Sequence, residues 1–345
     1  MRNLLADDLN HILDHTVALW NDVRGERIFI SGGTGFVGRW LLESFAWANQ
    51  RLSLGASAVV LTRFPEKFQR VAPHLAVDPA ISLHTGNITQ FQSPNGTFPL
   101  VIHAAAEMDA RTSDQGASRL FQSIVMGTER MLEFAAGRNT RRFLLASSGA
   151  VYGRQPPDLQ TMSEGYLGAP DLLNPGSIYG EGKRVAELFC TVHAYQQTLH
   201  PTIARGFAFF GPNMTLNGPY AIGNFLRDAQ SGGPIWVKGN GSAIRSYLYS
   251  ADMTIWLWTI LLRGQRCYPY NVGSEQAMSI IDLARFVAGS WEATPEVRVA
   301  TQTNSNAPID RYVPSTQRAF SDLGLTQTIA FEEGMQRWIK FLRSQ

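Results

Sequence analysis

The spacing of apolar positions predicts an amphipathic helix at the start of the chain. The apolar or small residues that recur at helical spacing, with polar residues between them, are Leu5, Leu9, Ile12, Leu13, Thr16, Val17 and Trp20. We interpret residues 1–24 as a helix that packs on the main domain. The alternative is a dimerisation or regulatory element.

From Arg27 onward, short apolar runs alternate with helical segments. The run at residues 28–30 is followed by a glycine-rich turn, a helical segment from Trp40 to Trp47 and a second apolar run at residues 58–61. Further runs lie at residues 100–103, 143–147 and 202–208. Continuous apolar runs are typical of strands that are buried on both faces. The sequence therefore predicts an α/β fold with a doubly wound parallel sheet.

After about residue 210 the alternation gives way to loops rich in Gly, Pro and Asn with shorter helices. We therefore expect a main domain at 25–209, which also receives roughly 243–273, and a smaller C-terminal region formed by 210–242 and 274–345. The strongly apolar stretch Met253 to Leu262 covers about half of the roughly 20 residues that a membrane span requires. We interpret it as a buried helix.

Composition narrows the class of protein. The chain has 345 residues, 44% hydrophobic and 17% charged, which is typical of a globular enzyme-sized protein. A net charge of +2 lacks the basic excess of nucleic-acid-binding proteins. The two cysteines, Cys190 and Cys267, suggest neither a disulfide framework nor a zinc site, and no targeting segment is apparent. We expect a cytoplasmic protein that binds neither nucleic acid nor membrane.

A glycine-rich turn follows the first predicted strand and opens a helix. Its glycines are Gly32, Gly35 and Gly38, within the run Gly32-Gly33-Thr34-Gly35-Phe36-Val37-Gly38. Glycine permits a tight turn, close approach to a pyrophosphate and close helix packing, while the helix N-terminus attracts anions. This pattern predicts a dinucleotide site.

The end of the second strand indicates which dinucleotide binds. An acidic residue there would bind an unphosphorylated ribose, whereas this chain has Thr62 and Arg63. A guanidinium suits a 2′-phosphate, and the Thr62 hydroxyl adds a donor. We expect NADP(H) to be preferred, with NAD(H) possible.

Three residues predict acid/base chemistry at an alcohol or carbonyl carbon. Tyr179 and Lys183 are four residues apart, so they share one face of a helix. A nearby ammonium favours the phenolate, which allows Tyr179 to take a proton from a substrate hydroxyl. Ser148 ends a predicted strand, where its hydroxyl can hold the reacting oxygen.

Together these motifs resemble those of extended short-chain dehydrogenases/reductases, in the group of nucleotide-sugar epimerases, dehydratases, decarboxylases and 4-keto reductases. The resemblance covers about residues 25 to 285. Besides the glycine turn and the Ser148, Tyr179 and Lys183 set, it rests on Gly86-Asn87-Ile88, His103-Ala104-Ala105-Ala106, Val151-Tyr152-Gly153, Gly211-Pro212, and Arg245-Ser246-Tyr247 leading to Asp252.

The resemblance implies a Rossmann dinucleotide-binding domain, a smaller substrate-binding domain and a homodimer formed through helices of the sheet domain. It implies that Ser148, Tyr179 and Lys183 are catalytic, that Lys183 contacts the nicotinamide ribose, that Asn87 lies beside the adenine and that Arg245 contacts the substrate diphosphate. The cofactor site predicted in this way comprises Gly32, Thr34, Gly35, Phe36, Val37, Gly38, Thr62, Arg63, Asn87, Ile88, Ala104, Ala105, Ala106, Tyr179 and Lys183.

Departures from the family pattern favour some reactions over others. Where 4,6-dehydratases carry an Asp-Glu pair and decarboxylases a glutamate, this chain has Gly149-Ala150, which cannot transfer a proton. Dehydration would need Glu107 or another relocated carboxylate. Two asparagines of the pattern are replaced by Ile124 and Ala208, which alters the expected substrate contacts on that side.

The leading hypothesis is hydride transfer on a nucleotide-diphosphate sugar, at C4, by a 4-keto reductase or 4-epimerase. The expected substrate residues are Glu107, Ser148, Asn213, Asn224, Lys238 and Arg245. Tyr247 and Tyr249 are candidates to flank a base, although core packing is the simpler role. The alternatives are a 4,6-dehydratase with a relocated carboxylate, a reductase of a small non-nucleotide carbonyl, and an NADP-sensing scaffold without catalysis.

Overall fold

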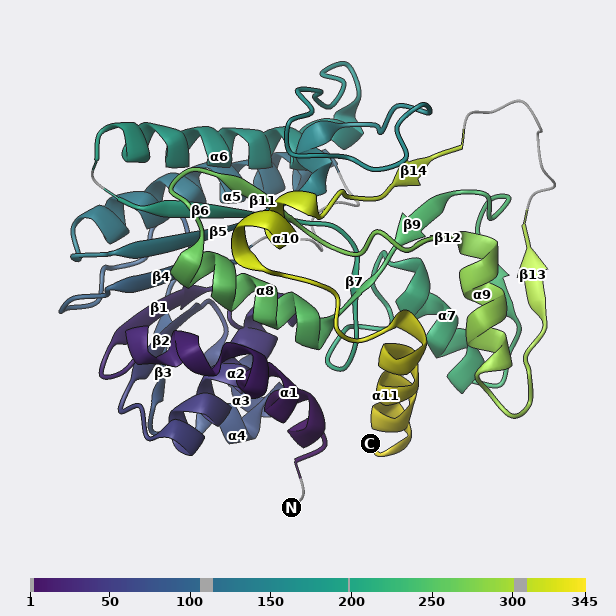
Figure 1. Ribbon diagram of the computed structural model, residues 1–345, viewed down its shortest axis with the longest axis horizontal. Coiled ribbons are helices and arrows are strands. Elements are labelled where there is room, and N and C mark those ends of the chain that lie inside the picture. Colours follow the sequence, from purple (N-terminus) through teal and green to yellow (C-terminus); the bar gives the residue numbers. More distant parts are fainter. Residues whose placement is uncertain (1–2, 106–113, 198, 301–308) are drawn as a thin grey trace.

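The central feature of the computed structural model is a seven-stranded parallel sheet of order β11-β6-β5-β4-β1-β2-β3 (Figure 1). The structure describes residues 3–105, 114–197, 199–300 and 309–345. The strands of this sheet are β1 (Arg27–Ser31), β2 (Ser57–Thr62), β3 (Ile81–Thr85), β4 (Leu100–His103), β5 (Arg142–Ser148), β6 (Pro201–Gly206) and β11 (Pro269–Val272). All neighbouring pairs run parallel, so the strands' carboxyl ends lie at one edge. The strand order reverses between β1 and β4, which confirms the predicted doubly wound sheet.

Helices cover both faces of the sheet. Helices α5 (Asp114–Ala136) and α6 (Ile178–Tyr195) lie on one face, and α1 (Ala6–Thr16), α2 (Phe36–Leu52) and α8 (Ser250–Arg263) on the other (Figure 1). Alternation along β1 produces this layering, since Ile28 and Ile30 join the core that contains α2 and α8, whereas Phe29 joins the core under α5 and α6.

The N-terminal helix is built into the main body. Leu9 and Ile12 of α1 are buried, and α1 packs on α2 and α8. Asp8 accepts hydrogen bonds from the Tyr249 hydroxyl (2.7 Å) and from Arg337 Nη1 (2.5 Å). The helix therefore packs on the main body and contacts Arg337 near the C-terminus.

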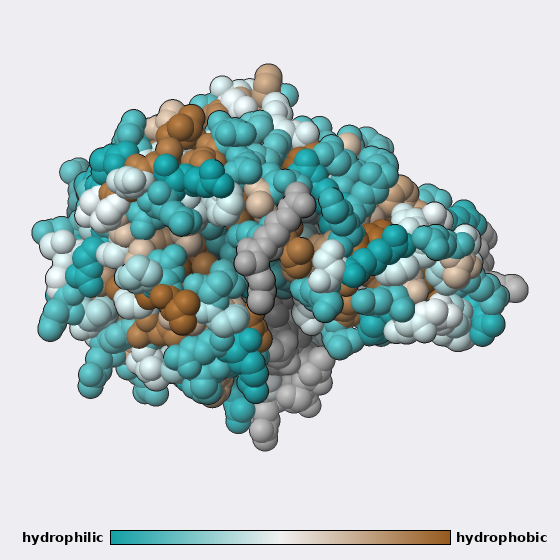
Figure 2. All heavy atoms as spheres, turned by 90° about the horizontal axis from the view of Figure 1, so that it is seen from below, coloured by the Kyte–Doolittle hydropathy of each residue, from teal (hydrophilic) through white to brown (hydrophobic). Residues whose placement is uncertain are grey.

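The apolar stretch from Met253 to Leu262 is the interior of α8, and every residue of it is buried between α1, α2 and the sheet. The prediction of a buried helix is confirmed. Among the described residues, no helix is long and apolar enough to cross a membrane. The face in Figure 2 is mostly hydrophilic, with separate small hydrophobic patches.

A smaller lobe lies beyond the carboxyl edge of the sheet, on the right of Figure 1. It contains a three-stranded sheet of order β12-β9-β14, a two-stranded pair β13-β8, and helices that pack beside them. Its elements are α7 (Ala221–Gln230), β8 (Ile235–Val237), β9 (Ile244–Ser246), β12 (Ala277–Ser279), α9 (Ile280–Gly289), β13 (Val297–Val299) and β14 (Arg311–Tyr312).

The remaining elements are short or peripheral. They are the 3-10 helices η1 (Val17–Asp22), η3 (Gly149–Tyr152) and η4 (Pro175–Ser177), helices α3 (Pro65–Val71), α4 (Pro73–Ala76), α10 (Gln317–Leu323) and α11 (Phe331–Arg343), and the paired strands β7 (Phe209–Phe210) and β10 (Leu248–Tyr249). The C-terminal helix α11 buries Phe331 and Trp338 against Phe210.

Candidate active site

The glycine turn joins β1 to α2 and requires Gly32 and Gly38 for steric reasons. Gly32 has a φ of +76°, and a Cβ there would lie 2.5 Å from the backbone of Ala104. At Gly38 a Cβ would lie 2.2 Å from the Gly32 carbonyl oxygen, so α2 begins in direct contact with the turn. Gly35, the residue before α2, has its nearest such contact at 3.4 Å and lines the cavity described below. The turn therefore forms a cradle that side chains would fill, which fits a pyrophosphate at the N-terminus of α2.

The other predicted cofactor residues follow the neighbouring strands at the same edge. Thr62 ends β2 and is buried, Arg63 after it is exposed, and Asn87 follows β3, which pairs with β2. Ile88 is buried in the core under α5. Phe36, Val37 and Ala104 line the cavity with the glycines, and Ala105 packs against the same core as Ile88. Thr34 is exposed in the turn, while Ala106 and Glu107 lie outside the described residues.

A buried histidine connects the two loops that form this cradle. His103 Nδ1 lies 2.7 Å from Ser31 Oγ, and Nε2 lies 3.0 Å from Thr128 Oγ1. Thr128 donates its proton to the Ile124 carbonyl (2.6 Å), so its hydroxyl accepts from Nε2–H, and Nδ1 accepts from Ser31. Burial, together with the charge of Lys183, lowers the pKa of His103 to about 3. A neutral ring therefore holds β1 and β4 in register just before Gly32 and Ala104.

The three predicted catalytic residues face one cavity of about 1680 Å³. Ser148 ends β5, and its Oγ accepts from the Ala150 N–H at 3.2 Å. Tyr179 and Lys183 lie on the first turns of α6, as the spacing predicts. Lys183 is 2% exposed, and its Nζ donates to the Ala146 carbonyl at 2.7 Å, which fixes the ammonium beside the end of β5.

Predicted substrate residues line the same cavity from the smaller lobe. Arg245 on β9 donates to Asp310, with Nη2 at 2.5 Å from the carboxylate, and Lys238 is exposed at the cavity wall. Asn224 on α7 also lines it and accepts from Arg227 at 3.1 Å. Asn213 is not among the described residues that line the cavity.

The aromatic residues near Arg245 separate into two roles. Tyr249 is completely buried against Phe210, so it cannot flank a base. Tyr247 is also largely buried, but its side chain reaches the cavity wall. Core packing, the simpler expectation for both, therefore holds for Tyr249.

Sequence reasoning missed many of the residues that line the cavity, among them two cations and a tyrosine. Arg311 and Tyr312 form β14, which pairs with β9 beside Arg245, and Arg227 lies on α7. Arg311 Nη2 donates to Gln160 at 2.9 Å. The cavity-lining cations Arg227, Lys238, Arg245 and Arg311 are called the cation cluster below, and such groups suit a diphosphate. Two of them are paired with carboxylates that also line the cavity, Arg227 with Asp228 and Arg245 with Asp310. β14 reaches the site by pairing with β9. Nothing in its local sequence predicts this pairing, so Arg311 and Tyr312 were missed.

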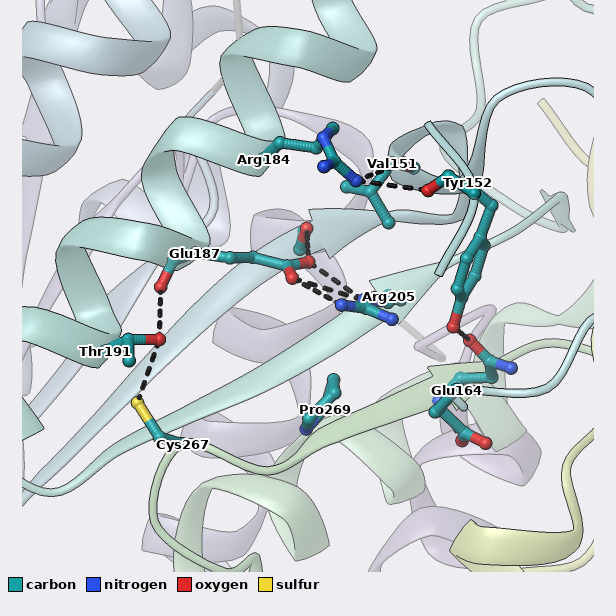
Figure 3. A network of polar contacts seen from close by, with 12 residues as sticks. Val151, Tyr152, Glu164, Arg184, Glu187, Thr191, Arg205, Cys267 and Pro269 are labelled. Carbon is teal, nitrogen blue, oxygen red and sulfur yellow. Dashed lines mark hydrogen bonds and ion pairs between the residues drawn. The ribbon is translucent and has the colours of Figure 1, made fainter. Parts of the chain in front are cut away.

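A polar network supports α6 from behind (Figure 3). Glu187 on α6 accepts from Arg205 on β6 at 2.6 Å and from the Ser147 hydroxyl at 2.5 Å. The Arg205 guanidinium also stacks over the Tyr152 ring, 4.8 Å from its centroid. Burial raises the pKa of Tyr152 to about 12, and its hydroxyl donates to Asn271. These contacts fix the helix of Tyr179 against the strand of Ser148.

Comparisons with known proteins agree with this geometry. Residues 28–273 match the model of the NAD dependent epimerase/dehydratase family. The chain is 28% identical to UDP-glucuronic acid decarboxylase 1 of Xenopus tropicalis over 93% of this chain and 73% of that protein.

Two solved structures share the fold. One is the UDP-glucuronic acid 4-epimerase from Bacillus cereus in complex with UDP-glucuronic acid and NAD, with a TM-score of 0.77, 18% identity, and coverage of 92% of this chain and 99% of that one. The other is dTDP-glucose 4,6-dehydratase from Streptomyces venezuelae with NAD bound, with a TM-score of 0.77, 20% identity, and coverage of 92% and 97%.

Proposed function

Because this chain belongs to the NAD dependent epimerase/dehydratase family, we propose that it transfers a hydride at C4 of a nucleotide-diphosphate sugar, as a 4-keto reductase or a 4-epimerase. One observation carries the proposal. A single cavity contains the glycine turn, the Ser148, Tyr179 and Lys183 set and the cation cluster, whereas the position after Ser148 is a glycine. Hydride transfer at an alcohol carbon needs those groups and no additional carboxylate.

Each residue of the set has its own part in the chemistry. The nicotinamide cofactor, when bound at the glycine turn, supplies or accepts the hydride. Tyr179 takes the proton of the C4 hydroxyl as the carbon is oxidised, and it returns that proton when the ketone is reduced. Lys183, fixed by the Ala146 carbonyl, stabilises the phenolate form of Tyr179. Ser148 holds the C4 oxygen in position.

Arg63 favours the phosphorylated cofactor in this proposal. Its exposed guanidinium follows β2, where a 2′-phosphate would lie, and no carboxylate closes that strand. Arg63→Ala should raise the KM for NADPH much more than that for NADH, while Arg70→Ala on the neighbouring helix α3 changes neither. Equal effects of Arg63→Ala on both cofactors would contradict the preference and favour NAD(H).

UDP-glucuronic acid is the first substrate to test, because it appears in the names of both a relative and a solved neighbour. The experiment incubates the protein with UDP-glucuronic acid and cofactor and follows carbon dioxide, the sugar products and nicotinamide absorbance. A C4 epimer without net change in cofactor establishes the epimerase. Consumption of NADPH with a 4-keto sugar, abolished by Tyr179→Phe, establishes the reductase.

Decarboxylation is the second candidate, because UDP-glucuronic acid decarboxylases of Xenopus tropicalis and Danio rerio are similar to this chain over more than 90% of its length. Release of carbon dioxide from UDP-glucuronic acid would establish it in place of the first. For dehydration, which also needs the C5 proton removed, the cavity-lining carboxylate of Asp171, exposed on the loop before η4, is the relocated residue to test. Asp171→Asn should abolish such an activity and leave hydride transfer at C4 unchanged.

The effect of Arg245→Ala and the turnover of a sugar nucleotide distinguish the proposed function from a small-carbonyl reductase and from an NADP-sensing scaffold. In the nucleotide-sugar proposal, Arg245→Ala raises the KM for the sugar nucleotide at least tenfold, which corresponds to about 1.4 kcal/mol for one charge-assisted contact. A small-carbonyl reductase would be insensitive to Arg245→Ala, and a sensor would bind cofactor without turnover of any sugar.

The outer face of α6 is consistent with the homodimer that the family resemblance implies. Leu188, Val192 and Tyr195 lie on one face of α6, spaced four and three residues apart, and are 59%, 43% and 89% exposed. Met126 of the adjacent α5 is also exposed. Leu188→Asp should convert a dimer into a monomer in analytical ultracentrifugation. Exposed Phe320 on α10 provides the control, since Phe320→Asp should leave the dimer intact.

A further inference from the structure

The space above Gly149 is occupied by two aromatic side chains. Gly149 directly follows Ser148, and a Cβ at Gly149 would lie 2.6 Å from the Tyr312 hydroxyl oxygen and 2.6 Å from Cζ of Phe207. Real Cβ atoms do not approach other atoms this closely. The glycine is therefore what allows the Tyr312 hydroxyl to stand next to Ser148, in the volume that any side chain at position 149 would need.

Tyr312 is held rigidly although β14 is only two residues long. Its backbone pairs with Arg245 of β9, and the next residue, Val313, donates its N–H to Gln155 Oε1 at 3.0 Å and accepts from Met162 at 2.8 Å. The Tyr312 ring packs on Phe207, with ring centroids 4.5 Å apart. A strand fixed on both sides thus directs one phenol to the catalytic end of the cavity.

The Tyr312 hydroxyl belongs to the same group as Ser148 and Tyr179. It lies close enough to the Ser148 side chain and to the Tyr179 phenol for both to affect its pKa. Burial, reinforced by the neighbouring Tyr179, raises the pKa of Tyr312 above its usual range. The Gly206 carbonyl, 3.5 Å away, is at the limit of hydrogen bonding. Tyr312 therefore keeps its proton and can donate it in a hydrogen bond to a ligand.

We propose that Tyr312 is a further catalytic residue, whose neutral phenol donates a hydrogen bond to the C4 oxygen of the sugar beside Ser148. The inference rests on the proposed function, because it concerns the same oxygen. Tyr312 neither gains nor loses a proton: Tyr179 exchanges the proton, and Ser148 and Tyr312 stabilise the charge that develops on the oxygen while the hydride moves. Where the dehydratase pattern has carboxylates after the serine, this chain has a neutral hydrogen-bond donor, the Tyr312 hydroxyl.

The test compares Tyr312→Phe with the wild type, with cofactor and the nucleotide sugar that the wild type converts. The substitution removes one oxygen and preserves the ring that packs on Phe207. Loss of a single oxyanion donor lowers kcat by roughly 100-fold or more. We expect a kcat decrease of about this size, an unchanged KM for the sugar within about threefold, and unchanged cofactor affinity and Tm. We also expect a larger primary isotope effect when the transferred hydrogen is deuterium, placed at C4 of the sugar for an epimerase or on the reduced nicotinamide for a reductase.

Two further variants make the comparison specific. Tyr268→Phe removes a phenol outside the cavity-lining residues, where Arg318 covers the ring at 4.0 Å, and should leave kcat unchanged. Gly149→Ala should displace the Tyr312 hydroxyl and lower kcat as Tyr312→Phe does. A Tyr312→Phe enzyme with wild-type kcat and isotope effect overturns the proposal, as does a folded Gly149→Ala enzyme with full kcat.

Failure of the proposed function gives a different result. If the wild type converts no nucleotide sugar but reduces a small carbonyl, the nucleotide-sugar proposal is wrong, and the same variants are compared on that carbonyl. A Tyr312→Phe decrease there supports the donor role, and equal rates refute it. A wild-type protein that turns over neither class of substrate refutes both proposals.

Discussion

Replacing Gly35 or Gly38 of the glycine turn with alanine should have two different effects. At Gly38 a methyl group would lie 2.2 Å from the Gly32 carbonyl oxygen and 2.5 Å from Gly33 Cα, both backbone atoms that cannot move independently. Overpacking of this kind costs about 1–3 kcal/mol, and contact with backbone places Gly38→Ala at the upper end. At Gly35 a methyl group meets nothing closer than 3.4 Å and points where the cofactor would approach.

The expected results separate stability from affinity. Gly38→Ala should lower the Tm by several degrees and weaken cofactor binding, because the turn itself shifts. Gly35→Ala should keep stability within about 1 kcal/mol of the wild type and still weaken cofactor binding at least tenfold. The assays are thermal unfolding of the protein without cofactor and calorimetric titration with NADPH and NADH.

Gly289→Ala is the matched control, since a Cβ at this position at the end of α9 has no neighbour within 4 Å. It should leave both the Tm and cofactor affinity unchanged. Wild-type cofactor affinity in Gly35→Ala would refute the assignment of the turn as the pyrophosphate cradle. An unchanged Tm in Gly38→Ala would refute the steric argument, whatever its effect on binding.

The site and its surroundings support three further predictions. Tyr179→Phe and Lys183→Met should each lower kcat for hydride transfer by at least 100-fold in steady-state assays, because each disables the exchange of the C4 proton, and retention of the wild-type rate by either would contradict the assignment. The pKa of His103 is about 3 in the folded state and 6.5 in the unfolded state. Between these pH values only the unfolded state binds the extra proton, so the free energy of unfolding falls as the pH falls from 6.5 toward 3. Urea unfolding should show up to about 1.4 kcal/mol lost per pH unit from this group, and His103→Asn should lack that contribution. Glu187→Ala leaves a largely buried guanidinium unpaired and should cost about 3–5 kcal/mol in urea unfolding. Glu296→Ala, at an exposed ion pair, should leave the free energy of unfolding nearly unchanged.

The parts of the fold that sequence predicted are those with a local signature. The apolar runs before Gly32 and at residues 58–61, 100–103, 143–147 and 202–208 all contribute strands to the large sheet. In contrast β3 was not predicted, because only Ile81 among its residues is buried while Ser82 and Thr85 are exposed at the sheet edge. An edge strand lacks the continuous apolar run that reveals its buried neighbours.

The candidate site also contains some residues with a local sequence signature and others without one. Tyr179 and Lys183 are recognisable because one helix fixes their spacing, and Ser148 because it ends a strand beside them. Arg311 and Tyr312 reach the cavity only through the pairing of β14 with β9, across more than 60 residues of chain. No periodicity over a two-residue strand could have indicated this contact.

The same contact bears on which reaction the shared fold performs here. In the proposed function, Ser148, Tyr179 and Lys183 make hydride transfer possible but do not select the next chemical step, since dehydration and decarboxylation begin from the same ketone. Which step follows depends on the side chain next to the residue that follows Ser148. That residue is Gly149, and Phe207 and Tyr312 occupy the space beside it. A neutral phenol there can stabilise an oxygen but cannot remove a proton from carbon at neutral pH, because its pKa is raised above the usual range. Dehydration would therefore need a carboxylate from another loop to remove the C5 proton, whereas reduction of the ketone from the same or the opposite face, and loss of carbon dioxide from a 4-keto uronic acid, need no such base.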